Sequence, residues 1–462
     1  MSNSSLYIAL SGLEVDQAGL ATTAQDISNV NTPGFQRETA GISTVNGGDS
    51  LGIGGGAQVS SIVQASNSFL QAASLQADAN VSNVTATQQT LSSIQAAFPE
   101  PSQYGISEQL STFWNAWDAI AQNPSSSAPR TALISTAQNI VTALNQASSQ
   151  LNTLANQTTT QLSTTVGEVN TLLSQVANLN QQIISAGGGG KANSLIDQRN
   201  QAISQLSQDI GATVRLQSDG AATVSVGGVA LVQGNVADTV QIATSPTGQF
   251  SLTSKMTGAT LDVTNGASAG LLASLNTYIP QYTTQINGVA ADLANTVNTQ
   301  LAAGYYYDSA TSTWVSGSNA PMFLNSFTGT TTGVTAASIE VNPAMVANPE
   351  TIAASGTNVI PDATNNGANA QAIANLFDAP GGPDKAYRIL IEDIGAQVQG
   401  ANQQLQTQTS VQTAASQALQ SATGVSTDAE MVKSVQYQNA YQAAAKVIAV
   451  TQTALQSLLA AV

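Results

Sequence analysis

The feature that most constrains this chain is a heptad pattern of apolar residues at both ends. The pattern steps alternately by four and three residues over 6–27 and again over 437–462, which is the spacing of a helix with one coiled-coil seam. We therefore predict two long terminal helices whose apolar seams need partners, either each other or other copies of the chain. The seam residues are Leu6, Leu10, Leu13, Leu20 and Ile27, then Tyr437, Tyr441, Ile448, Leu455, Leu458 and Val462.

Polar residues interrupt each seam once. Gln17 and Thr451 stand at seam spacing, and a polar residue in a coiled-coil seam sets the register of the helices. Burying five Leu and Ile side chains contributes on the order of 10 kcal/mol, whereas ordering a residue costs about 1–2 kcal/mol. We therefore hypothesise that the ends order only on assembly, and protected terminal amides in a free monomer would contradict this.

The composition excludes many chemistries. The chain of 462 residues has no cysteine and no histidine, so it cannot build a Ser-His-Asp triad, a cysteine nucleophile, a thiolate zinc site or an iron–sulfur cluster. We expect no cofactor and no metal. Its 10 basic residues are scattered against 26 acidic ones, so a nucleic-acid partner is not expected.

Carboxylate chemistry would be the remaining route to an enzyme. The acid pairs, such as Glu14 with Asp16 and Asp428 with Glu430, stand two residues apart or closer and do not share a helix face. We interpret them as solvated surface, with Asp428 and Glu430 also complementing a helix N-terminus. A secreted carboxylate-dependent hydrolase is kept as an alternative that would need two acids in one cleft.

Two glycine-rich segments are only superficially similar to nucleotide loops. Gly52, Gly54 and Ala57 precede an alternating segment that favours a strand, so a hairpin turn is the better interpretation. The four glycines at 187–190 are followed by Lys191 without the Ser or Thr of a phosphate loop, and they favour a helix connection.

The sequence favours neither membrane insertion nor Sec export. No apolar run approaches a membrane span, and no basic residue precedes Arg37, which leaves the N-terminus without the basic region of a signal peptide.

The predicted fold class is mainly α with a small inserted β domain. Seams at 162–183 and 195–210 predict an antiparallel helical hairpin, and Pro280 should kink the helix over 272–296 or stand in its first turn. The other predicted helices are 67–97, 107–121, 130–158 and 385–421, and the predicted strands are 213–216, 222–226, 228–232, 250–253 and 338–341.

We predict four structural parts from these elements. They are a terminal coiled-coil domain of 1–65 plus 425–462, a helical-bundle domain of 66–210 plus 266–303 plus 338–424, an outer β domain of 211–265, and a mixed insertion of 304–337.

Three segments carry a resemblance to a known family. The segment 26–35 after the first helix resembles the N-terminal signature of bacterial flagellar axial proteins, with Ser28, Asn29, Asn31, Pro33, Gly34 and Phe35 in its turn. The segments 195–206 and 425–448 resemble the flagellar hook-associated protein 1 family in particular.

The resemblance implies a structural protein of the hook–filament junction and no catalysis. Its members form a ring of subunits through paired terminal helices, between hook protein and a second junction protein, hook-associated protein 3. It also implies export through the flagellar apparatus without a cleaved signal, an extracellular place in the flagellum, and a cytoplasmic chaperone on the C-terminal helix. A flagellar hook or rod axial protein remains the alternative.

Overall fold

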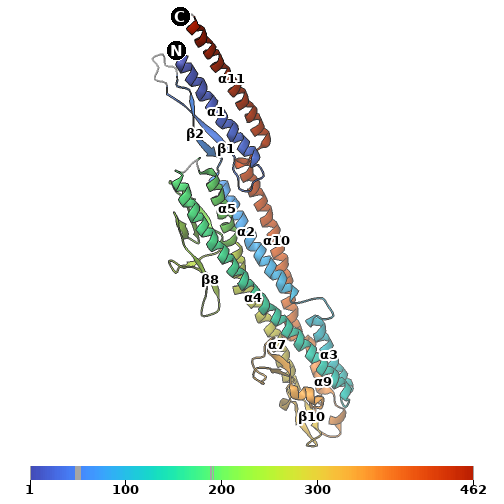
Figure 1. Ribbon diagram of the computed structural model, residues 1–462. Coiled ribbons are helices and arrows are strands. Elements are labelled where there is room, and N and C mark those ends of the chain that lie inside the picture. Colours follow the sequence, from blue (N-terminus) through green and yellow to red (C-terminus); the bar gives the residue numbers. More distant parts are fainter. Residues whose placement is uncertain (1, 47–53, 188–189, 191, 461–462) are drawn as a thin grey trace.

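The computed structural model describes residues 2–46, 54–187, 190 and 192–460, and it is an elongated, mainly helical molecule (Figure 1). The two termini lie together at one end, and strand β10 lies at the other end. The helices are α1 Ser2–Ser28, α2 Ser68–Ala96, α3 Ile106–Gln122, α4 Ser127–Ser185, α5 Asn193–Ile210, α6 Ala267–Ala273, α7 Ile279–Ala302, α8 Pro343–Ala347, α9 Ala368–Ala374, α10 Pro383–Thr423 and α11 Thr427–Ala460.

The strands form small antiparallel sheets beside the helices. One sheet has the order β3-β4-β5-β6, another has β7-β8-β9, and three further sheets are the pairs β1-β2, β10-β11 and β12-β13. Their bounds are β1 Glu38–Thr44, β2 Ala57–Gln64, β3 Thr213–Leu216, β4 Ala222–Val226, β5 Val229–Gln233, β6 Val236–Ala237, β7 Val240–Thr244, β8 Phe250–Ser254, β9 Thr260–Leu261, β10 Tyr305–Asp308, β11 Thr313–Ser316, β12 Phe323–Asn325 and β13 Ile339–Val341.

Two hydrophobic cores follow one another along the rod, and α4 runs through both. The core nearer the termini joins α5 and the second half of α4 to strands of both β3–β6 and β7–β9. The core at the far end surrounds the ring of Trp117, which is fully buried, and includes α3, α7, α9 and the start of α10. The strands of 211–265 thus share a core with helices, because such short strands bury too little apolar surface alone.

The mainly α fold class with its small β part is confirmed, and most expected helices are present. The segments 130–158 and 162–183 belong to one continuous helix, α4, where the sequence suggested two. Pro280 stands in the first turn of α7, directly after a π-helical segment, Ser274–Tyr278. That segment lets α6 continue into α7, since the proline lacks an N–H to donate. Gly188, Gly189 and Lys191 of the predicted connection lie outside the described residues.

Asn180 of α4 fastens the four-stranded sheet to the helices. Its side chain is fully buried and donates to the carbonyls of Ala222 and Gly234, both at 2.8 Å. Its Oδ1 accepts from the backbone N–H of Ala222 at 2.9 Å and from Arg199 at 3.3 Å. One amide therefore satisfies backbone groups of strand β4 and of the turn between β5 and β6 at once.

Asn180→Ala is expected to lower the free energy of unfolding by about 2–4 kcal/mol, because it leaves several buried polar groups unpaired. Equilibrium urea denaturation measures this loss. Asn156→Ala is the matched control, since Asn156 is exposed on the same helix; equal losses in the two variants would contradict the anchoring role.

Candidate assembly interface

The terminal helices pair through small residues. Helices α1 and α11 run antiparallel side by side (Figure 1). Gly19 of α1 lies under the ring of Tyr437, so that a Cβ at Gly19 would lie only 2.5 Å from Cε1 of that ring. Seven residues earlier, about two helical turns away, a Cβ at Gly12 would lie 3.8 Å from Cβ of Ala444. Small residues on α1 thus let the two backbones approach closely.

The leucine seam of α1 is not buried by this pairing. The buried apolar residues of α1 are Ala9 and Val15, whereas Leu10 is 45% exposed. The other seam residues, Leu6, Leu13, Leu20 and Ile27, are only half-buried.

The hairpin β1–β2 also packs on α1, where the N–H of Ala57 donates to Oγ of Ser11 at 3.2 Å. Pairing of the two ends therefore leaves the leucine seam of α1 only partly covered, and Gln17, which stands within the seam, is exposed.

The predicted seam of α11 faces α1 in part. Tyr437, Ile448, Thr451 and Leu455 are half-buried, and Tyr441 is 40% exposed. The side chain of Leu458 and the whole of Val462 lie outside the described residues. A second apolar stripe on α11 is exposed to solvent and consists of Val432, Val435, Val447 and Val450.

The signature turn closes α1 and directs the chain toward α10. Asn29 donates from its side chain to the carbonyl of Gln25 at 3.0 Å, and Ser28 donates to that of Ala24 at 2.8 Å. Gly34 takes a φ of 82°, a left-handed conformation that favours glycine. The exposed Asn31, Pro33 and Gly34 and the half-buried Phe35 line a groove against the end of α10, whereas Ser28 and Asn29 are not among its lining residues.

Buried charges gather where the two terminal helices meet the hairpin. Asp26 of α1 is 0% exposed and Glu430 of α11 is 1% exposed. Asp26 accepts from the backbone N–H of Glu38 at 3.0 Å, and Glu430 accepts from Lys433 at 2.7 Å. The expectation that Glu430 is solvated surface is wrong. A signal was available, because Glu430 lies seven residues before Tyr437 and Asp26 lies seven after Gly19.

The pKa of Asp26 is raised to about 6, chiefly by burial and further by the carboxylates of Glu430 and Glu38. The hydrogen bond from Glu38 and the charge of Lys433 oppose this rise. Burial likewise raises the pKa of Asp197 and of Asp209 to about 6. Both Asp26 and Glu430 are closed to solvent, which does not fit the open cleft that a carboxylate hydrolase needs.

Stability is expected to fall as the pH rises from about 4 to 7. A carboxyl whose pKa is higher in the folded than in the unfolded chain binds its proton more tightly when folded, so its stabilisation is lost as pH rises through 6. Asp26→Asn should make stability depend less steeply on pH, because only Asp197 and Asp209 then contribute to the fall. Thermal unfolding from pH 4 to 8 measures the slope, and a slope that is unchanged by Asp26→Asn would contradict this assignment. Asp428→Asn, at an exposed position of α11, is the control.

Family comparisons match both the middle and the end of the chain. Residues 91–313 match the family described as "Flagellar hook-associated protein FlgK helical domain". Residues 415–461 match the family described as "Flagellar basal body rod FlgEFG protein C-terminal". The chain is therefore of the class of flagellar axial proteins.

Individual proteins of similar sequence narrow the class of flagellar axial proteins further. The chain is 27% identical to flagellar hook-associated protein 1 of Escherichia coli K12 over 317 residues, which are 64% of this chain and 57% of the relative. It is 24% identical to that of Bacillus subtilis over 504 aligned residues, covering 98% of this chain and 97% of the relative. These matches support the flagellar hook-associated protein 1 family for this chain, with the helical-domain model covering residues 91–313. The chain spans 57% of the length of the E. coli relative.

The fold also matches that of a solved structure. The flagellar hook junction protein FlgK from Burkholderia pseudomallei superposes with a TM-score of 0.64 at 19% identity, over 78% of this chain and 100% of that chain. In the described part of this chain, no helix combines the length and the apolar character needed to cross a bilayer.

Proposed function

We propose that this chain is a structural component of the bacterial flagellum that joins hook to filament by self-assembly into a ring through its terminal helices. The observation that carries the proposal is the uncovered apolar surface on both helices of the α1–α11 pair. Leu10 of α1 and Val450 of α11 are 45% and 69% exposed although they lie on paired helices. Exposed apolar stripes on paired helices suit burial between copies of the chain.

The proposed partners are those of a junction subunit. They are other copies of the chain in the ring, hook protein on one side and hook-associated protein 3 on the other. A cytoplasmic export chaperone would cover α11 before assembly, and the exposed stripe Val432, Val435, Val447 and Val450 supplies an apolar face for it. The chain would act outside the cell, in the flagellum, after export without a cleaved signal, and would catalyse no reaction.

Electron microscopy of a deletion strain tests the proposal. Cells without the chain should keep hooks and lack filaments, and expression of the full chain should restore the filaments. Filaments of normal number in the deletion strain would overturn the proposal.

A hook or rod protein is the second candidate, because residues 415–461 match the rod-protein C-terminal family. Such a protein should polymerise alone into long tubes, whereas a junction protein should stay mostly monomeric when purified. Sedimentation of the purified chain separates the two candidates.

A further inference from the structure

A cavity of about 500 Å³ opens at the end of the molecule far from the termini. It lies between the hairpin β10–β11, the segment 350–366 and the start of α4. This volume is within the range of small-molecule sites. The side chains that the argument uses are Tyr305, Tyr307, Trp314, Arg130, Glu350 and Asn366.

One wall of the cavity is aromatic and held in place. Tyr307 and Trp314 face each other across the hairpin, with ring centroids 5.6 Å apart and an edge-to-face angle of 61°. Tyr305 is on the same face, two residues earlier in β10. Its backbone exchanges two hydrogen bonds with Ser355, at 2.8 and 3.1 Å, which fix the hairpin to the segment opposite.

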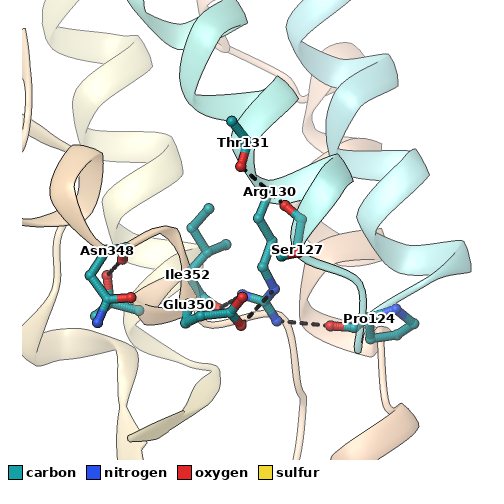
Figure 2. Close-up of polar contacts among 8 residues, drawn as sticks. Pro124, Ser127, Arg130, Thr131, Asn348, Glu350 and Ile352 are labelled. Carbon is teal, nitrogen blue, oxygen red and sulfur yellow. Dashed lines mark hydrogen bonds and ion pairs between the residues drawn. The ribbon is translucent and has the colours of Figure 1, made fainter. Parts of the chain in front are cut away.

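The other wall holds two opposite charges. The side chain of Arg130 is only 9% exposed, and it donates to the carbonyls of Ile352 at 2.6 Å and Pro124 at 2.9 Å (Figure 2). Its Nε lies 3.8 Å from Oε2 of Glu350, whose side chain is 54% exposed. Glu350 accepts no hydrogen bond from the described residues, so its carboxylate can accept from a ligand.

The charges of Arg130 and Glu350 disfavour a charged ligand in this cavity. An anion would meet the carboxylate of Glu350, and two of the donor nitrogens of Arg130 already bind carbonyls. A cation attracted by the aromatic rings and by the carboxylate of Glu350 would also meet the positive charge of Arg130. The cavity therefore suits a neutral ligand.

The polar groups around the aromatic rings narrow the class of ligand further. Oδ1 of Asn366 accepts from the N–H groups of Gly356 at 2.9 Å and Ala368 at 3.0 Å, which orients its NH₂ as the free donor. Ser125, Ser309 and Thr364, which carry hydroxyl groups, are also among the lining residues. A pyranose ring offers apolar C–H faces to the negative faces of aromatic rings and hydroxyls to donors and acceptors at their edge.

We propose that this cavity binds a neutral pyranose saccharide, stacked on Trp314 and Tyr307 and hydrogen-bonded to Glu350 and Asn366. The site is separate from the terminal helices, so its failure would leave the proposed role in the flagellum untouched. Arg130 acts as a positioning residue that holds the carboxylate of Glu350 at the cavity.

Saturation-transfer NMR on the full chain tests the proposal with glucose, galactose, mannose, N-acetylglucosamine and their disaccharides. At least one of them should receive saturation, and Trp314→Ala should weaken its binding about tenfold or more. Glu350→Gln keeps the shape of the side chain and should weaken binding about threefold or more. Tyr104→Ala, at an aromatic residue that is 74% exposed outside the cavity, should bind as the wild type does.

Three results would overturn the proposal. They are no saturation of any saccharide at 10-fold excess over about 1 mM protein sites, equal binding by the wild type and by Glu350→Gln, and binding of choline, a cationic probe, in place of the saccharides. A disaccharide coupled to a carrier protein, compared with the same free disaccharide, separates a surface glycan from a soluble sugar as the source of the ring.

Discussion

Leu10→Glu is expected to abolish incorporation of the chain into the flagellum while leaving the isolated monomer folded. Leu10 is 45% exposed in the monomer, and surface substitutions usually change the free energy of unfolding by no more than about 0.5 kcal/mol. In an assembled ring, the proposed function places the leucine seam between subunits, where an unpaired carboxylate costs several kcal/mol. Urea denaturation of the monomer and electron microscopy of complemented cells measure the two effects separately.

The control is Met256→Glu, which places the same charge on an apolar side chain that is 64% exposed in the turn after β8. It should leave both the monomer and the filaments unchanged. Filaments of normal number and length in the Leu10→Glu strain would show that the leucine seam faces solvent in the flagellum, and the ring would then need another interface.

The periodicity of the sequence was enough to predict the terminal helices but not the face through which they meet. Apolar side chains mark the seam over 6–27, whereas the contact with α11 uses the glycines at 12 and 19. A search for large apolar residues cannot detect a contact made by their absence. The burial of Asp26 and Glu430 was not predicted either: Glu430 was interpreted as solvated surface, and residue 26 entered only as the start of the signature segment 26–35.

The strands also show how far the sequence alone predicts the fold. Strands with clear alternation, such as β4, were predictable, and Gly227 and Gly228 take positive φ in the turn to β5. Strands β6 and β9 have two residues each, too few for any pattern to show. The cavity beside β10 was not predictable either, because residues more than 170 positions apart, such as Arg130 and Tyr307, meet only in the folded chain.

Gly19→Leu is expected to separate α1 from α11. Leucine favours a helix more than glycine does, so the substitution keeps α1 helical and opposes the pairing through its size. Its Cβ would lie 2.5 Å from the ring of Tyr437, and overpacking of this kind costs about 1–3 kcal/mol. The paired arrangement should therefore become about 5- to 150-fold less populated.

A disulfide reports this pairing directly, because the natural chain has no cysteine. The Cβ position of residue 12 lies 3.8 Å from that of Ala444, the usual separation in a disulfide, so Gly12→Cys with Ala444→Cys should oxidise readily. Adding Gly19→Leu should slow the reaction, and adding Tyr437→Ala as well should restore it by removing the ring that the leucine displaces. Equal oxidation with and without Gly19→Leu would contradict the close approach at Gly19. Oxidation of the purified monomer would also count against the hypothesis that the ends order only on assembly, since the two cysteines meet only when both helices are formed and paired.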